Sequence, residues 1–403
     1  SLCQFNSVLT VREMSADGMK AIGNPVIVFD GNGTPHRTAE GPKFYKRDGW
    51  YWIFCPAGGV PTGHQLAMRS KSPYGPYETK VVLATGNTEV NGPHQGGWVH
   101  LASGEDWFLH FQDKEAYGRV VWLEPIKWVD NWPVMGEKLQ ASKQNKMYNP
   151  YLPELDEYCG QPVLKYKKPN VGKTFPICNP VESDEFNTIE LGKQWQWNAN
   201  YDQTYGMPTP YGSFRLYCHR QSAEFKNLWE TGNLLLQKTP ADNFTATAKL
   251  SMTAKEEGQY GGIICFGMDY SSLVLRRVGN EFQLQEISCQ NADKGKAEKV
   301  AVIATFQPTS ADKVDYQPAL HCDIYMRLKV EYLGGKTEMG ENKHEAKVTF
   351  AYSTDGKKFV TCGEPHKMRQ GKWVGAKIGL CAAEPAGKKV RGWLDVDWFR
   401  ISK

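Results

Sequence analysis

Short apolar runs separated by turn signals extend along this whole sequence, and they restrict it to a β architecture. Turns are indicated at residues 47–49 (Arg-Asp-Gly), 102–104 (Ala-Ser-Gly) and 354–356 (Thr-Asp-Gly). No amphipathic pattern of helical period continues for more than a few turns. The predicted fold class is therefore all-β.

The apolar runs follow two different patterns. In residues 49–55 (Gly-Trp-Tyr-Trp-Ile-Phe-Cys) both faces of the strand are apolar, so the strand needs cover on both sides, as in stacked propeller blades. In residues 244–252 and 324–332 apolar and polar side chains alternate. One packed face and one wet face are typical of a β-sandwich.

A stretch rich in Pro, Lys and Gly separates the two patterns, between about residues 154 and 180. A chain of 403 residues is long enough for two domains with sizeable cores. We predict part of a propeller at residues 1–158, a linker at 159–180 and a sandwich at 181–403.

A weak internal repeat supports the propeller. Gly41-Pro42 and Gly92-Pro93 each precede an aromatic strand, and the two pairs lie 51 residues apart, the length of a four-stranded blade. Only about two such units are present, whereas a closed propeller needs at least four. The first domain is therefore expected to lack blades at its N-terminal side.

Composition excludes several classes of partner. The chain has 48 basic and 44 acidic residues, so it shows no charge excess that would indicate a nucleic acid or an anionic membrane. Its longest apolar runs are too short to insert across a bilayer. The 13 Trp residues suit both β cores and sugar stacking, and these alternatives stay open.

The ten cysteines show no CxxC pair and no zinc-type spacing with histidine. Several, such as Cys55 and Cys265, lie inside apolar strands. Buried free thiols are therefore favoured over disulfides.

Glu40 is a candidate catalytic acid. Glycoside hydrolysis commonly needs one carboxylic acid to protonate the leaving oxygen and one carboxylate to activate water or attack carbon. Glu40 lies at a strand start, where Gly41 permits close approach and Pro42 sets the entry into the strand. On this pattern alone, a solvated Glu at a loop end is the competing interpretation.

Longer blocks of sequence resemble a known family. Glycoside hydrolase family 43, of the β-xylosidase and α-L-arabinofuranosidase type, is similar to this chain at residues 39–54, 69–77, 91–96 and 111–119, in order and at family-like spacing. The β-xylosidase C-terminal domain, a concanavalin A-like sandwich or jelly roll, is similar at residues 183–186, 194–198 and 393–399.

The resemblance implies a five-bladed propeller and roles for single residues. Glu40 matches the acid, His94 matches a histidine near the propeller axis that helps hold an ion or water, and Arg119 matches an arginine that reaches the sugar. Gln112 and Trp98, in or beside the same blocks, are predicted substrate-binding residues. The alternatives are a strand-end histidine satisfied by backbone and an ordinary ion pair of Arg119.

The chain also departs from the family pattern. In the family a base Asp and a second, pKa-tuning Asp precede the acid, but only 39 residues precede Glu40 here, and Asp17 and Asp30 match neither motif. We expect an N-terminally truncated propeller that lacks roughly two and a half blades. The alternative is a natural protein that closes its propeller with another chain.

The function implied is exo-acting, inverting hydrolysis that releases arabinose or xylose from hemicellulose such as arabinoxylan, xylo-oligosaccharides or arabinan. The partner would be a hemicellulose-derived oligosaccharide, and the location periplasmic or secreted. The alternative is a non-catalytic carbohydrate-binding fragment, since both Asp partners are missing.

No cofactor is required for this chemistry. Asp184, near the start of the sandwich, and Asp395, near its end with Asp397, are candidate oxygen ligands for a structural calcium ion. Solvent-facing acids on strands are the competing interpretation.

Overall fold

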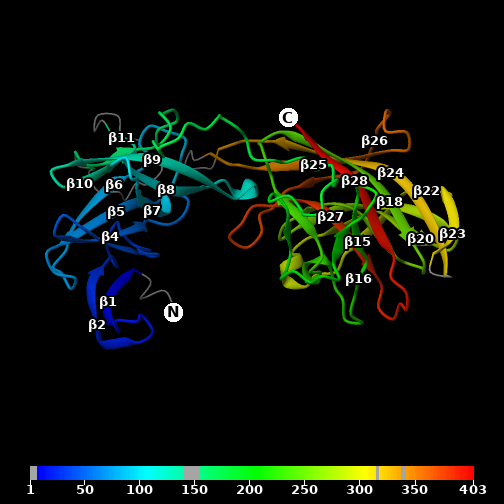
Figure 1. Ribbon diagram of the computed structural model, residues 1–403, viewed down its shortest axis with the longest axis horizontal. Helices are drawn as coiled ribbons and strands as arrows, with labels where there is room; N and C mark the ends of the chain where they lie inside the picture. Colours follow the sequence, from blue (N-terminus) through cyan, green and yellow to red (C-terminus); the bar gives the residue numbers. More distant parts are fainter. Residues whose placement is uncertain (1–6, 140–154, 156, 315–316, 337–341) are drawn as a thin grey trace. The chain divides into compact units, whose positions relative to one another are not determined.

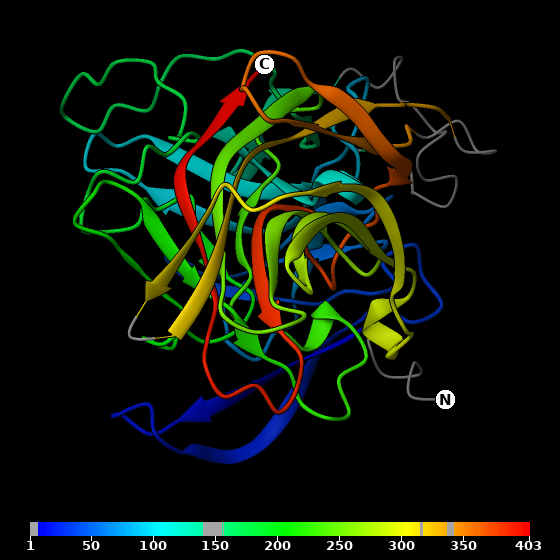
Figure 2. The ribbon, with the colours of Figure 1, turned by 90° about the vertical axis from the view of Figure 1, so that its right-hand side faces the viewer.

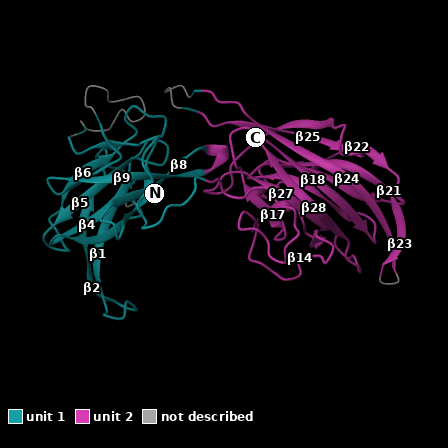
Figure 3. Ribbon diagram, turned by 45° about the horizontal axis from the view of Figure 1, so that its top comes forward, with its two compact units in different colours: residues 1–114, 119–177, 336–342 teal, residues 115–118, 178–335, 343–403 magenta. Residues whose placement is uncertain are grey.

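The computed structural model describes residues 7–139, 155, 157–314, 317–336 and 342–403. The chain forms two compact units (Figures 1 and 3). Unit 1 comprises residues 1–114, 119–177 and 336–342, and unit 2 comprises residues 115–118, 178–335 and 343–403. The change from unit 1 to unit 2 at residues 177 and 178 lies inside the predicted linker.

Unit 1 is built from one hairpin and two blade-like sheets. The hairpin pairs β1 (Val8–Met14) with β2 (Ala21–Asp30). The first blade contains β3 (Lys43–Arg47), β4 (Trp50–Ala57), β5 (His64–Ser70) and β6 (Glu78–Leu83), extended by β12 (Gly160–Gln161) and β11 (Glu137–Lys138). The second contains β7 (His94–His100), β8 (Asp106–Asp113), β9 (Arg119–Val129) and β10 (Trp132–Met135).

Strand β4 is covered on both faces, as its sequence predicts. Trp52 and Phe54 belong to the apolar cluster that also holds Phe108 of the second blade. Ile53 and Cys55 point the other way and belong to the cluster that holds Leu9 of the hairpin. The first blade is therefore packed between the hairpin and the second blade.

A bulge interrupts the start of β7. The pairing of β7 with β8 shifts between His94 and Gly97, and Gln95 has a positive φ of 44°. Gly96 is required there because a Cβ atom would lie 2.0 Å from the Phe108 ring. A bulge of this kind re-aims the side chains beside it, and here it affects Gln95.

Unit 2 is a sandwich of two large sheets (Figure 2). In order, one sheet contains β13 (Gln196–Trp197), β17 (Leu235–Lys238), β27 (Lys377–Glu384), β19 (Tyr260–Phe266), β20 (Tyr270–Val278), β21 (Glu281–Cys289) and β22 (Lys299–Phe306), with β16 (His219–Arg220) paired to β27. The other contains β14 (Gly206–Pro208), β15 (Phe214–Tyr217), β28 (Trp393–Ser402), β18 (Phe244–Ala254), β24 (Gln317–Tyr332), β25 (Ala346–Ser353) and β26 (Val360–Lys367), with β23 (Ser310–Val314) paired to β24. Short 3-10 helices occur at η2 (Glu115–Tyr117), η4 (Leu228–Glu230) and η5 (Ala292–Lys294).

The main core of unit 2 lies between these sheets. The predicted alternation is confirmed, because residues 244, 246, 248, 250 and 252 of β18 are buried while the residues between them are more exposed. Strand β24 alternates in the same way across residues 324–330. The sequence prediction of an all-β chain with a sandwich downstream is therefore confirmed.

The cysteines also agree with the prediction. The nine that the structure describes are free thiols, and most are buried, as predicted. Burial raises the pKa of the Cys55 and Cys265 thiols to about 12, so both are inert at neutral pH.

The connection between β8 and β9 belongs to unit 2, a feature that the sequence did not predict. Backbone N–H of His344 donates to Glu115 Oε2 at 2.7 Å, and the Tyr117 hydroxyl donates to the carbonyl of Asp242 at 2.7 Å.

None of the helices in the described part of the chain is long and apolar enough to cross a membrane.

The glycines of the β7 bulge allow a matched test of its packing. We expect Gly96→Ala to lower the free energy of unfolding of unit 1 by about 1–3 kcal/mol, because the new methyl group overlaps the Phe108 ring and the Leu109 carbonyl. Gly97→Ala is the control, since its Cβ would meet only the Tyr45 hydroxyl, at 4.0 Å. Urea unfolding of the two variants gives the comparison, and equal midpoints would contradict this account of the bulge.

Candidate active site

Glu40 lies directly before β3, at one edge of the first blade. Its backbone N–H donates to the carbonyl of Pro56 at 3.3 Å, which ties it to the neighbouring strand. Its side chain is 46% exposed, so a ligand can reach the carboxyl group. The next residue, Gly41, has φ +54°, and a Cβ there would press on the Gln95 side chain at 3.4 Å.

Two side chains from β7 hold the Glu40 carboxyl group. The His94 Nε2 atom lies 3.2 Å from Glu40 Oε1, and the Gln95 amide donates to the same oxygen at 3.3 Å. Since β3 and β7 are edge strands of different blades, this contact joins the two edges. Among the described residues, no donor bonds Glu40 Oε2, so this is the oxygen available to a ligand.

His94 is buried and neutral at pH 7. Burial lowers the pKa of its imidazole, and this effect exceeds the opposing influence of Glu40. Arg119 lowers the His94 pKa as well, and Asp113 raises it. A neutral imidazole beside a carboxylate donates from one nitrogen only, so Nε2–H bonds Glu40 and Nδ1 carries no proton. That Nδ1 atom is buried and has no hydrogen-bond partner in the described part of the chain.

Two further histidines lie next to His94, and sequence reasoning missed them. The His36 Nδ1 and His64 Nε2 atoms lie 2.9 Å apart. Burial lowers the pKa of His64 to about 3, with smaller contributions from His36 and His94. Burial also lowers the pKa of His36. No motif links these residues, because each comes from a different strand or loop.

Arg119 begins β9 and lies near the same site. Its guanidinium is 4.5 Å from the centre of the Phe111 ring, and its influence on the His94 pKa places its charge nearby. The Nε atom is buried without a hydrogen-bond partner among the described residues. No ion pair of Arg119 occurs in the described chain, so its partly exposed guanidinium is not committed to a carboxylate, and the sugar contact stays a prediction.

Gln112 is buried and Trp98 is partly buried. The Gln112 amide donates to the Glu89 carbonyl and to Asn91 Oδ1, and its oxygen accepts from the Trp122 indole. The Trp98 indole donates to Asp106 Oδ1 at 2.8 Å, and its ring packs edge-on against Trp128 and Tyr45. Both side chains are occupied by protein partners, and their contact with substrate stays a prediction.

The two sandwich aspartates have separate sets of partners. Asp184 accepts hydrogen bonds from the backbone of Phe186 and from the Trp195 indole. Asp395 forms a bidentate ion pair with Arg215, in which Nε donates to Oδ1 and Nη2 donates to Oδ2, each at 2.8 Å. Across residues that the structure describes, no group of three or more His, Cys, Asp or Glu side chains could hold a metal ion. The arrangement therefore lends no support to calcium.

Comparison with known proteins agrees with this architecture. The model of the "Beta xylosidase C-terminal Concanavalin A-like domain" matches residues 183–402, more than half of the chain, and the model of "Glycosyl hydrolases family 43" matches residues 3–133. The chain belongs to glycosyl hydrolase family 43. Within this family it is of the type in which the concanavalin A-like domain follows the propeller part.

Several family 43 relatives are longer than this chain. A putative β-xylosidase of Xylanibacter ruminicola is 31% identical over 92% of this chain and 59% of its own length. A β-xylosidase of Formosa agariphila is 28% identical over 96% of this chain and 63% of its own. A non-reducing end α-L-arabinofuranosidase of Bacteroides ovatus is 27% identical over 60% of this chain and 44% of its own length. The chain thus spans about six-tenths of the length of the first two.

A solved structure shows the same fold. A bifunctional family 43 protein of Bacteroides eggerthii superposes with a TM-score of 0.70 at 23% identity, covering 98% of this chain and 46% of that one. Its likeness confirms the predicted fold of a propeller part and a sandwich.

The buried histidines predict acid sensitivity of unit 1. His64 has a folded pKa of about 3 against an ordinary 6.5, so below pH 6.5 the unfolded chain binds a proton that the folded chain excludes. Its stabilising contribution, present above pH 6.5, is lost as the pH falls toward 3, at roughly 1.4 kcal/mol per pH unit. His36 and His94 act in the same direction, because burial lowers the pKa of each.

We expect His64→Gln to reduce this pH dependence. Hydrogen exchange of peptides from β4 and β5 between pH 6.5 and 4.5 measures it within unit 1. His100→Gln is the control, because that side chain is 60% exposed. If wild type and His64→Gln lost protection in parallel as the pH fell, the buried neutral His64 would not be the cause.

Proposed function

We propose that this protein is an exo-acting, inverting glycosidase of family 43 that releases arabinose or xylose from hemicellulose, with Glu40 as the general acid. The observation that carries the proposal is the environment of Glu40. An accessible carboxyl group lies at the junction of two blades, held by the neutral His94 and by Gln95, in a chain that matches the family in both units.

The geometry suits proton donation to a leaving oxygen. Both hydrogen bonds end on Oε1, which leaves Oε2 to carry the proton and meet the glycosidic oxygen. Arg119 is partly exposed and has no ion pair among the described residues, so its guanidinium suits sugar hydroxyls. Inversion also requires a base on the opposite side of the sugar, with the carboxyl groups roughly 6.5–9.5 Å apart. We assign no residue of this chain to that role, because Asp17 and Asp30 match neither family motif.

The substrate class follows from the relatives. Two of them are described as β-xylosidases and a third as a non-reducing end α-L-arabinofuranosidase, which supports a pentose and attack at a chain end. Family 43 hydrolysis uses water and no cofactor. Calcium is left out of the proposal, since Asp184 and Asp395 bind protein donors. A periplasmic or secreted location is included, because a polysaccharide substrate is met outside the cytoplasm.

Two substrates with different leaving groups test the role of Glu40. We expect Glu40→Gln to lower kcat on xylobiose or arabinobiose by about 10²–10⁴-fold, because the departing sugar hydroxyl needs a proton. On a dinitrophenyl xyloside or arabinofuranoside the loss is much smaller, since that leaving group departs without protonation. Steady-state kinetics of the 403-residue chain gives both values.

The matched control is Glu78→Gln. Glu78 lies on β6 and pairs with Arg69 at 3.0 Å, so this change also removes one carboxylate from the first blade. Equal losses on both substrates in Glu40→Gln would exclude the acid role. If the wild-type chain bound xylobiose but hydrolysed neither substrate, it would be a carbohydrate-binding module instead.

A further inference from the structure

The core face of the sandwich becomes polar at one end. Along β20, Leu275 and Leu273 belong to the core between the sheets, and Ser271 follows on the same face. Along β21, Phe282 and Leu284 belong to that core, and Glu286 follows. Ser271 and Glu286 are almost completely buried. Polar side chains at core positions are rare in a sandwich unless they serve structure or function.

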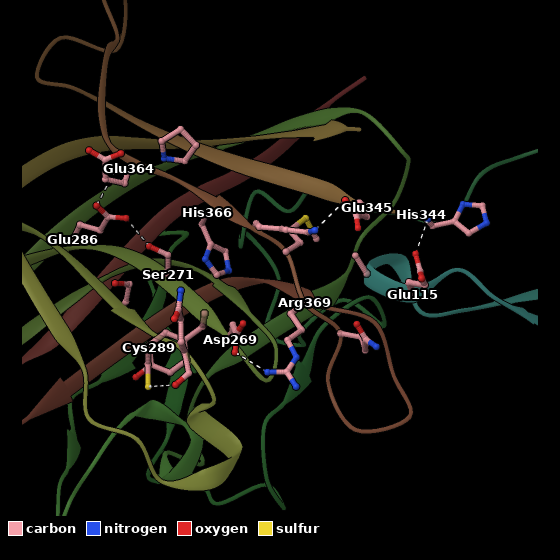
Figure 4. Close-up of a pocket in the computed structure, with 18 residues that line it drawn as sticks. Glu115, Asp269, Ser271, Glu286, Cys289, His344, Glu345, Glu364, His366 and Arg369 are labelled. Carbon is pink, nitrogen blue, oxygen red and sulfur yellow. Dashed lines mark hydrogen bonds and ion pairs between the residues drawn. The ribbon is translucent and has the colours of Figure 1, made fainter. Parts of the chain in front are cut away.

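The facing sheet contributes a polar residue to the same place. His366 of β26 pairs with Val348, a core residue of β25, so both side chains point toward the space between the sheets. A cavity of about 520 Å³ lies here, within unit 2, and Figure 4 shows the side chains that line it. Its volume falls within the range of small-molecule sites, roughly 300–1,000 Å³.

The carboxylate on the floor of this cavity is held in place by protein donors. The Ser271 hydroxyl donates to Glu286 Oε1 at 2.9 Å, and the Glu364 backbone N–H donates to Oε2 at 3.0 Å. Gly363 allows this approach, because a Cβ atom would lie 2.7 Å from Oε2. Each carboxylate oxygen still has capacity to accept another hydrogen bond.

Arg369 is positioned in a similar way. Its guanidinium donates to Asp269 Oδ1 at 3.0 Å (Figure 4) and to Asn291 Oδ1 at 3.0 Å. The cavity therefore has oriented polar groups on more than one side before any ligand enters.

His366 supplies an unused polar atom. Its Nε2 is buried and has no hydrogen-bond partner in the described part of the chain. Burial lowers the pKa of His366 to about 4, and Asp269 opposes this effect, so the ring is neutral at pH 7. A buried polar atom without a partner destabilises the fold, and a ligand hydroxyl would supply the missing hydrogen bond.

The charges of the lining restrict the class of ligand. Five carboxylates line the cavity, against the full positive charges of Lys367 and Arg369: Glu115, Asp269, Glu286, Glu345 and Glu364. This excess repels anions such as phosphates and sugar acids. The described residues provide no cluster for a metal ion. Neutral hydroxyl groups suit the carboxylates, the neutral imidazole and the guanidinium together, and Pro365 and Met368 supply apolar contacts for C–H groups.

From this lining we propose that the cavity between Glu286 and His366 is a second sugar site, which binds a neutral mono- or disaccharide independently of hydrolysis. The site lies entirely in unit 2, so it does not rest on the proposed catalytic role of Glu40.

Sugar titrations of the full chain test the proposal. Isothermal calorimetry with xylose, arabinose and xylobiose is run on wild type, His366→Leu, Glu286→Gln and Glu40→Gln. His219→Leu is the matched control, because His219 is also a partly buried sandwich histidine with a buried unpaired Nδ1, but lies outside the cavity. Circular dichroism establishes that each variant is folded.

We expect at least one sugar to bind wild type with a dissociation constant on the order of 1 mM. His366→Leu and Glu286→Gln each weaken this binding at least about tenfold, the loss of one hydrogen bond, whereas His219→Leu leaves it unchanged. If His366→Leu does not fold, Glu286→Gln decides. Absence of sugar binding, or binding lost only in Glu40→Gln, would overturn the proposal.

Discussion

Unit 1 depends on the need to cover both faces of β4. Trp52 and Phe54 on one face and Ile53 and Cys55 on the other are removed from water only if the blade is packed between two neighbours. Apolar burial contributes about 25 cal/mol per Å², so these four buried side chains together outweigh any single polar contact at the blade edge. The second blade is held against the first by this apolar face, and that packing places His94 beside Glu40.

Both units use burial to keep imidazoles neutral next to carboxylates. In unit 1 desolvation outweighs the influence of Glu40 on His94, and in unit 2 it outweighs the influence of Asp269 on His366. A neutral imidazole is a hydrogen-bonding group without charge. A neighbouring cation would favour the ionised form of a carboxyl group, so a neutral imidazole is the better neighbour for a proton donor such as Glu40. A neutral imidazole also suits the hydroxyl groups of a neutral sugar. The two sites thus share one feature, a buried neutral imidazole beside a carboxylate, although they lie on unrelated sheets.

The family resemblance identified part of the candidate active site, and the residues that it missed were missed for physical reasons. Glu40 and His94 lie in blocks of family-like sequence, and the structure brings them into contact. Gln95 was missed, because its contact with Glu40 depends on a β-bulge that no sequence pattern predicted. His36 and His64 were missed because their contact joins a loop to β5 across 28 residues of chain. Gln112 and Trp98 lie in or beside the same blocks, yet their polar atoms are used within the fold.

The sequence by itself determined the strand pattern and the change from doubly apolar to alternating strands, because periodicity and turn residues act locally. It determined the candidate acid through the resemblance of longer blocks to a known family. Only the tertiary structure decided which polar groups share a site. Asp184 and Asp395, predicted as shared calcium ligands, bond to different partners. Ser271 and Glu286, on the paired strands β20 and β21, share a cavity with His366 of the facing sheet. Which side chains become neighbours depends on the strand order in each sheet and on how the core faces of the two sheets pack. The residue pattern along the chain determines neither.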